Sequence, residues 1–252
     1  MDTSRFVIRD HQWVKMEPHC LGLKAHPGRT GSDARLFMEA IFWIARTGSP
    51  WRDLPPGFGN WNTLNRRFRD WARAGVFERI FNALSDQPDM EMAMIDGMIV
   101  KVHRAGQGAK GGLSGQAIGK SNCGWTTKIL ALTDALGNLV RFMLLPGNRY
   151  DTVGVAPLIK GLSFDALLAD KAFDSNWIID EMNVRGASIC IAQHTRRKDP
   201  LQIDDEMYKW RHLAENFFCN LKDFRRIALR TGKTDLSFAA IINTCAALLN
   251  TR

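Results

Sequence analysis

Cysteine is sparse in this 252-residue sequence, and no cysteine is placed as zinc ligands usually are. The chain contains no CxxC or CxH pair, which argues against a zinc site. An odd number of widely spaced cysteines is typical of reduced thiols in a cytosolic protein. The five residues are Cys20, Cys123, Cys190, Cys219 and Cys245.

Long apolar runs are also missing. The first residues lack the apolar segment of a signal peptide, and no later stretch is long and apolar enough to span a membrane. The sequence has no internal repeat and no low-complexity segment. We therefore expect a cytoplasmic protein with no membrane partner.

The sequence does have an excess of positive charge and enough apolar residues for a core. The formal net charge is +8 and 45% of the residues are hydrophobic, which suits one larger domain or two small ones. A basic chain fits a polyanionic partner, because each neutralised phosphate releases counterions. The glycine-rich stretch 104–124 is predicted to be a flexible basic loop, and it lacks the GKS or GKT of a Walker loop.

Residues 1–90 are predicted to be helical. Asp33 is placed to cap a first helix, Gly48 ends it, and a second helix is predicted at 62–74. Two helices joined by a loop, the second rich in arginine, could form a helix-turn-helix reader of DNA. The alternative is an ordinary helical pair, which the pattern alone slightly favours because the loop is longer than in the compact motif. The arginines are Arg66, Arg67, Arg69 and Arg73.

The pattern changes near residues 87–89, so we expect a second domain at 91–252. Strands that form a hairpin and then alternate with helices predict a mixed α/β sheet with helices packed on its faces. The expected strands are 94–100, 126–133, 139–145, 166–169 and 188–192. The expected helices are 153–162, 176–185, 205–227 and 238–249.

Two aspartates stand out in these strands. Asp96 interrupts an apolar strand, and a carboxylate there is costly to desolvate unless it is paired or binds a cation. Asp170 ends another apolar strand, at the edge where ligands of open α/β sheets bind. Considered singly, each is better explained as a structural residue, either a partnered acid or a turn residue.

The helix expected at 205–227 carries a polar cluster opposite an apolar stripe. The cluster consists of Tyr208, Arg211, Glu215 and Lys222. Their spacing of three, four and seven residues places them within roughly a 60° arc of an ideal helix. The stripe that would pack the helix consists of Leu213, Phe217, Leu221 and Phe224. A merely solvated polar face is the alternative, and spacing alone does not exclude it.

Carboxylates from two strands and a helix suggest a two-metal site. Asp96, Asp170 and Glu215 could hold two Mg²⁺ ions, which favour oxygen ligands and often share them with substrate phosphates. Two such ions activate the attacking oxygen and stabilise the leaving one in a phosphoryl displacement. Arg211 and Lys222 would suit the negative charge that gathers in that transition state.

The spacing of the polar cluster, Y-x₂-R-x₃-E-x₆-K, resembles the signature of DDE transposases from bacterial insertion sequences. The whole chain resembles the insertion-sequence-five family. The signature together with the block Trp-Arg-Asp-Leu-Pro at 51–55 is a specific signal. Further resemblance covers nearly all of the chain, at 28–30, 44–55, 126–129, 168–171, 215–218 and 224–227.

This resemblance implies a ribonuclease-H-like catalytic domain behind a helical N-terminal DNA-binding region. It implies catalytic and metal-binding roles for Asp96, Asp170 and Glu215, with Mg²⁺ or Mn²⁺ as the metal and two ions as the number. It implies double-stranded DNA as partner, in the form of terminal inverted repeats and a target site, bound by a homodimer or higher oligomer at the bacterial nucleoid. The expected DNA contacts come from Tyr208, Arg211, Lys222, Arg66, Arg67, Arg69, Arg73, Arg46 and Arg52.

The sequence departs from its relatives beside these residues. Gly97 stands where relatives commonly have Ser or Thr, and Ala172-Phe173 precedes Asp174 where they have Gly-Tyr. Neither departure touches a metal ligand. Three functions stay open: an active transposase, a DNA-binding repressor derived from one, and a structure-selective nuclease. Metal-dependent cleavage separates the first from the second, and joined products separate it from the third.

Overall fold

The computed structural model describes residues 6–23, 31, 33–85, 87–109, 112–113 and 115–251. Residues 28–30, which contribute to the resemblance, lie outside this part of the chain. The chain divides into two compact units, which are described one after the other. The first comprises Met1–Asp86, His103–Lys110 and Leu221–Arg252. The second comprises Gln87–Val102 and Gly111–Asn220.

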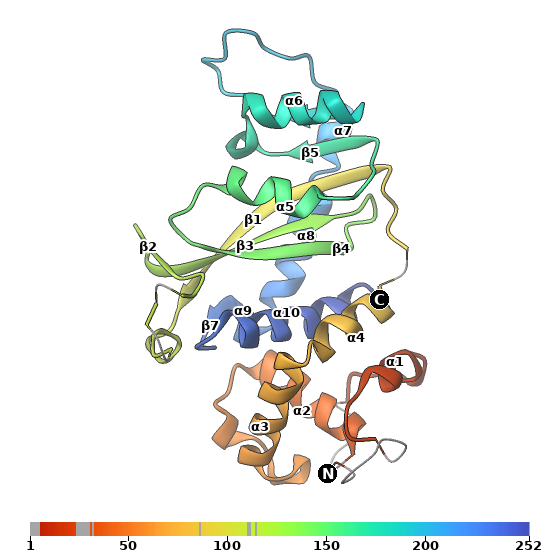
Figure 1. The fold of residues 1–252 in the computed structure, drawn as a ribbon, viewed down its shortest axis with the longest axis vertical. Coiled ribbons are helices and arrows are strands. Elements are labelled where there is room, and N and C mark those ends of the chain that lie inside the picture. The colour runs from red at the N-terminus through yellow and green to blue at the C-terminus, as the bar shows by residue number, and fades with distance from the viewer. Residues whose placement is uncertain are drawn as a thin grey trace. The chain divides into compact units, whose positions relative to one another are not determined.

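The first unit is mainly helical and draws its helices from both ends of the chain (Figure 1). Its N-terminal helices are α1 (Asp10–Met16), α2 (Ala34–Thr47), α3 (Trp61–Arg73) and α4 (Val76–Leu84). Its C-terminal elements are α9 (Arg225–Ala228), the short strand β7 (Leu229–Arg230) and α10 (Asp235–Leu249). The helices expected around residues 34–47, 62–74 and 238–249 are confirmed to within a few residues.

Local sequence signals set the ends of α2 and α3. The Asp33 carboxylate accepts the Arg35 and Leu36 N–H groups, at 2.8 and 3.1 Å. Gly48 ends α2 with φ 71°, a left-handed conformation that L side chains adopt at a cost. The Asn60 side chain caps α3 in the same way as Asp33 caps α2. Both caps satisfy N–H groups that lack a partner inside the helix.

The core of the first unit depends on α10. This helix is apolar on all sides, and it packs against α2, α3 and α4. Phe238, Ile242 and Cys245 are at most 2% exposed. The N-terminal helices therefore need the C-terminal segment to cover their apolar faces.

The second unit is built on a mixed sheet (Figure 1). Its strands are β1 (Met92–Val102), β2 (Gly119–Ser121), β3 (Gly124–Thr133), β4 (Leu139–Pro146), β5 (Ala166–Ala169) and β6 (Ser188–Ile191). Their order is β2–β3–β1–β5–β6, and β4 also pairs with β3. The pairs β1–β3 and β3–β4 are antiparallel, whereas β1–β5 and β5–β6 are parallel. This is the ribonuclease-H-like arrangement, so the predicted fold class is confirmed.

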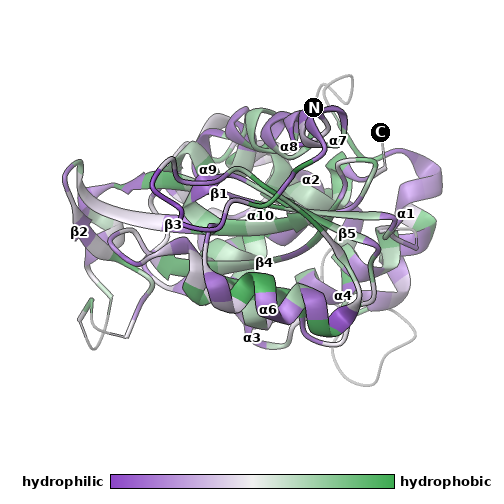
Figure 2. Ribbon diagram, turned by 90° about the horizontal axis from the view of Figure 1, so that it is seen from above, coloured by the Kyte–Doolittle hydropathy of each residue, from purple (hydrophilic) through white to green (hydrophobic). Residues whose placement is uncertain are grey.

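Helices cover both faces of this sheet. One core cluster joins Ile95 of β1 to Val155 of α5 (Val155–Ile159) and Ile178 of α6 (Asn176–Arg185). A second cluster on the opposite face joins β1, β5 and β6 to Ala214 of α8 (His212–Lys222). Figure 2 shows hydrophobic residues along β1 and β5 and a mixture of hydrophobic and hydrophilic residues along α6.

One expected element differs. The helix predicted at 205–227 is interrupted, because α7 (Asp205–Lys209) ends before α8 begins. The linking turn is closed by tighter i to i+3 bonds, from Arg211 N–H to the Tyr208 carbonyl at 3.2 Å and from Leu213 N–H to the Trp210 carbonyl at 3.0 Å. A further break precedes α9. The helix expected at 153–162 is also shorter, since α5 follows a 3₁₀ turn.

Among the helices of the described residues, none combines the length and the hydropathy that a membrane crossing requires.

Candidate active site

The register of two parallel strands places Asp96 beside Asp170. Ile95 of β1 is the partner of Ala169 of β5, and Asp96 and Asp170 are the next residues of the two strands. Since β5 ends at Ala169, Asp170 lies where its strand leaves the sheet. This is the edge at which sheets of this type bind ligands.

Both aspartates follow strand residues that face α8. Met94 and Leu168 belong to the cluster that packs on Ala214. Side chains of a strand alternate between the two faces, so Asp96, two residues after Met94, shares the face of Met94. The same spacing relates Asp170 to Leu168. Glu215, the third predicted acid, follows Ala214 in α8. The packing of α8 on the sheet therefore brings Glu215 to this face.

Arg211 links two of the predicted acids. Its Nη1 lies 3.4 Å from Asp96 Oδ2, and its Nη2 forms an ion pair with Glu215 Oε1. The guanidinium lies over the Tyr208 ring, 5.8 Å from the centroid. Arg211 and Asp96 are largely enclosed, with side chains 18% and 17% exposed, whereas Glu215 is 50% exposed.

Asp96 carries its negative charge at a cost. Burial raises the pKa of its carboxyl, although the Gly97 N–H, which donates to Oδ1 at 2.7 Å, and Arg211 oppose that rise. The carboxylates of Asp170 and Glu215 also raise this pKa. A cation placed among the three would relieve this repulsion.

The donor set fits a hard divalent cation in its chemistry. The three side chains offer only carboxylate oxygens, which Mg²⁺ and Mn²⁺ prefer. Arg211 already brings a positive charge to two of them. The described residues contain no group of three His, Cys, Asp or Glu side chains arranged to hold a metal ion.

The other residues expected to contact DNA lie in the first unit and in different surroundings. Lys222 is exposed at the last residue of α8, and Arg66 is exposed on α3. Arg67 differs from Arg66, because its guanidinium lies 4.5 Å from the Phe37 ring centroid and 4.7 Å from that of Trp71. Burial lowers the pKa of Arg67, which shows how far it is enclosed.

The remaining arginines lie in three different surroundings. Arg69 and Arg73 line one cleft of the first unit, and Arg73 also pairs with Asp70 at 2.7 Å. Arg46 lines a different, mainly apolar cavity, while Arg52 lies over the Trp61 ring. The expected DNA-contacting arginines therefore lie in different local surroundings.

Comparison with known proteins identifies the family. Residues 87–250 match the family described as "Transposase DDE domain". The chain belongs to this family of transposases. Residues 8–81 match a second family, described as "Putative transposase of IS4/5 family (DUF4096)". The resemblance inferred from the sequence is thus confirmed.

Curated relatives of this transposase come from several bacteria. The "Putative transposase for insertion sequence element IS6501" of Brucella ovis is 34% identical over 127 residues, which are 49% of this chain and 97% of the relative. A 16.2 kDa protein of insertion element IS402 from Burkholderia cepacia is 34% identical over 113 residues, 40% of this chain and 77% of the relative. Protein y4sN of Sinorhizobium fredii is 35% identical over 105 residues, 41% of this chain and 82% of the relative.

Solved transposase structures resemble the chain more distantly. A synaptic complex of piggyBac transposase with hairpin DNA has a TM-score of 0.46 and 11% identity, covering 95% of this chain and 70% of that one. The Mos1 strand transfer complex has a TM-score of 0.29 and 11% identity, covering 79% and 82%.

The structure explains why this transposase has glycine after Asp96. A Cβ at Gly97 would lie 3.3 Å from Asp151 Oδ1, closer than most real contacts. Asp151 pairs with the enclosed Lys128 at 2.5 Å. A serine or threonine would crowd this ion pair on the face of β1 opposite Asp96, so Gly97 fits the local packing.

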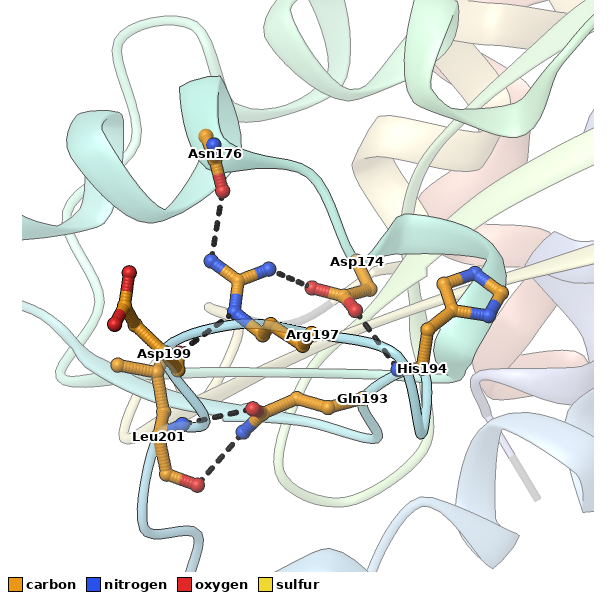
Figure 3. A network of polar contacts seen from close by, with 7 residues as sticks. All are labelled: Asp174, Asn176, Gln193, His194, Arg197, Asp199 and Leu201. Carbon is orange, nitrogen blue, oxygen red and sulfur yellow. Dashed lines mark hydrogen bonds and ion pairs between the residues drawn. The ribbon is translucent and has the colours of Figure 1, made fainter.

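A polar network organises the loop that follows β6 (Figure 3). The Asp174 carboxylate accepts the His194 N–H at 2.8 Å and pairs with Arg197. Arg197 also donates to the Asn176 side chain at 2.8 Å. Gln193 closes the loop through two bonds of 2.7 Å to the backbone of residue 201. The basic stretch 194–200 is therefore a braced loop, with Arg197 turned inward.

Sequence reasoning missed this network. It noted Asp174 only as part of a family motif. The Asp174 side chain is only 4% exposed, which indicates a structural role. The partners of Asp174 come from another segment of the chain, so no local sequence pattern predicts these contacts.

Proposed function

We propose that this transposase binds the ends of its insertion sequence, cleaves their phosphodiester bonds with a divalent metal and transfers the strands to target DNA. The observation that supports this most directly is the position of Asp96 beside Asp170 at one sheet edge, with Arg211 linking Asp96 to Glu215. Carboxylates gathered at one site gain nothing for the fold, since like charges destabilise it. Their cost is offset when they share a cation.

Each residue of the site has a separate task in this proposal. Asp96 and Asp170 are held by backbone N–H groups, from Gly97 at 2.7 Å and from Ala172 at 2.9 Å, so their oxygens are oriented in advance. Glu215 is half exposed and can adjust its side chain. Bound divalent ions, Mg²⁺ or Mn²⁺ and two in number, would supply Lewis-acid activation and charge stabilisation.

The cations of the site are proposed to act on phosphate. Arg211 neutralises the carboxylates in the absence of DNA and would contact a phosphate near the scissile bond when DNA is bound. Tyr208 lies against the Arg211 guanidinium and positions it. Lys222 would add a further phosphate contact. The substrates are the terminal inverted repeats and a target site, and a homodimer or higher oligomer would hold two ends together at the bacterial nucleoid, in the cytoplasm.

The direct test is a cleavage and strand-transfer assay on duplexes that carry the element ends from the source genome. The parent is expected to cut and join these ends in Mg²⁺ or Mn²⁺. Glu215→Gln keeps the size of the side chain and removes its charge, so it should bind the ends in EDTA but make no product. The matched control is Glu206→Gln, which alters an exposed glutamate that pairs with Lys209. If Glu215→Gln cuts as well as the parent, the active-site assignment is wrong.

A second candidate function is a repressor that binds the element ends without cutting them. It is favoured by the position of Arg211, which pairs with two of the acids. A parent protein that binds its ends and makes no cut with either metal would support the repressor. A parent that cuts but forms no joined product would instead indicate a nuclease.

A further inference from the structure

The first unit contains a cleft with a volume of about 700 Å³. Its lining includes residues of α3, of α10 and of the segment that precedes α10. Arg226 of α9 and Ala109 also line the cleft. N-terminal and C-terminal parts of the chain thus build one surface.

The cleft gathers positive charge. Its lining includes Arg69, Arg73, Arg226 and Lys233 and contains no aspartate or glutamate. Asn65, Arg69 and Arg73 follow one another at four-residue intervals, so they share a face of α3. Arg69 and Lys233 are exposed, and within the described part of the chain neither has an ion-pair partner.

Arg226 adds an enclosed charge that no carboxylate compensates. Its guanidinium donates to the Gly48 and Ser49 carbonyls, at 3.4 and 3.1 Å. Burial lowers its pKa, and among the residues described no carboxylate pairs with it. A guanidinium held by carbonyl groups alone keeps its attraction for an anion.

The rest of the lining suits an anion held against a low-dielectric wall. Phe68, Trp51 and Phe238 supply apolar surface, which strengthens the field of the nearby cations. Thr231 Oγ1 is buried and has no hydrogen-bond partner among the described residues. An unsatisfied buried hydroxyl at such a cleft is a donor for a ligand oxygen.

We propose that this cleft binds the phosphodiester backbone of DNA, with Arg69 and Lys233 contacting phosphates and Arg226 reinforcing the positive charge of the cleft. The proposal rests on the proposed function, because it identifies where that function holds its DNA. It differs from the sequence prediction in one respect. The DNA-binding surface needs residues 226–237 as well as α3, so residues 1–90 do not contain it.

The test measures binding of the full chain to a labelled duplex by fluorescence anisotropy in EDTA, over a series of NaCl concentrations. Each lost phosphate contact reduces the slope of log K against log salt by about one. Arg69→Ala and Lys233→Ala should each show that reduction and weaker binding, and the double variant about twice the reduction. The matched control is Arg225→Ala, which removes an exposed arginine next to Arg226 that does not line the cleft. In Arg225→Ala, DNA binding should weaken by no more than the small effect expected from removing one surface charge.

A variant with the opposite effect sharpens the test. Arg73 is partly neutralised by Asp70, at 2.7 Å. Asp70→Asn should free Arg73 and tighten DNA binding, with a steeper salt slope. Glu78→Gln removes an exposed carboxylate of the same unit outside the cleft and should leave the slope unchanged.

The outcomes distinguish this proposal from the proposed function. If Arg69→Ala and Lys233→Ala keep the parental slope while the parent binds DNA and cuts it, the cleft is not the binding surface and the function stands. If the variants lose slope as expected but the parent never cuts, the cleft stands and the cleavage proposal fails. If the parent binds no DNA even at low salt, both are overturned.

Discussion

Arg211 Nη1 lies 3.4 Å from Asp96 Oδ2, although the two residues are separated by 115 positions in the chain. The contact connects the turn before α8 to the middle of β1. Arg211 also pairs with Glu215, so one guanidinium compensates two carboxylates. The negative charges of Asp96 and Glu215 are thus compensated by a residue of the chain itself.

Replacing Arg211 should therefore destabilise the metal-free protein. In Arg211→Gln, Asp96 would keep a buried charge without its cation, which costs about 1–3 kcal/mol of unfolding free energy. Added Mg²⁺ should restore part of this loss, because it can take over the compensation. We expect thermal unfolding to show a larger Mg²⁺-induced rise in Tm for the variant than for the parent.

The control for Arg211 is Lys209→Gln, which removes an exposed cation of α7 that pairs with Glu206. It should change neither Tm nor the response to Mg²⁺. A response of Arg211→Gln to Mg²⁺ no larger than that of the parent would contradict the idea that Arg211 and a metal compensate the same charges.

Lys222→Ala should affect chemistry more than folding. Lys222 is exposed, so its loss should leave the unfolding free energy within about 0.5 kcal/mol of the parent. If Lys222 stabilises phosphate charge near the scissile bond, its removal should lower the rate of end cleavage by roughly tenfold. Removal of an enclosed hydrogen-bond donor lowers a rate by ~10²-fold or more. Single-turnover cleavage in Mg²⁺ measures this. An unchanged rate in a folded variant refutes the role.

Asp174→Asn should loosen the loop after β6. The substitution removes the charge that pairs with Arg197 and weakens acceptance of the His194 N–H. Hydrogen exchange of the amides of residues 193–201 should accelerate, whereas amides of β5 should keep their protection. Asp199→Asn is the control, because the Asp199 side chain is exposed and only its carbonyl accepts from Arg197. Equal exchange in both variants would show that Asp174 does not brace the loop.

Glu39 should give the stability of the first unit a pH dependence. Burial raises the pKa of its carboxyl, while the Val7 and Ile8 N–H groups, at 3.0 and 2.9 Å, and the nearby Arg35 and Arg46 oppose the rise. The folded protein therefore holds this proton more tightly than the unfolded chain. The resulting stability is complete below the unfolded pKa of about 4.3 and is lost as pH rises through the raised folded pKa.

Denaturant unfolding of the parent and Glu39→Gln between pH 4 and 7.5 measures this effect. The unfolding free energy of the parent should fall relative to the variant as pH rises. Glu78→Gln, at an exposed site of the same unit, should run parallel to the parent. Parallel curves for Glu39→Gln as well would show that the Glu39 proton is bound equally in both states.

Much of the secondary structure could be predicted because its signals are local. Asp33 and Gly48 delimit α2, and α6 occupies the predicted residues 176–185. A short apolar run also predicted β5, and with it the place of Asp170 at a strand end. In each case the residues that decide the conformation lie within one helical turn or one strand.

The interruption between α7 and α8 was not predictable from the same patterns. The stretch 205–227 has helical periodicity and contains neither glycine nor proline. The turn at Trp210 and Arg211 instead accompanies contacts to distant residues, the ion pair of Arg211 with Asp96 and the packing of Ala214 on the sheet. Periodicity describes an isolated helix and contains no information on these contacts.

The sequence by itself determined the family, the helical first part, the mixed sheet and the identity of the candidate acids, because composition, spacing and caps are properties of short segments. Only the tertiary structure decided that Arg211 pairs with two of those acids, that Asp174 braces the loop after β6, and that α10 completes the core of the first unit. It also brought Lys233 to the same cleft as Arg69. These relationships join residues far apart in the chain, and they form only when burial of apolar surface brings distant segments together.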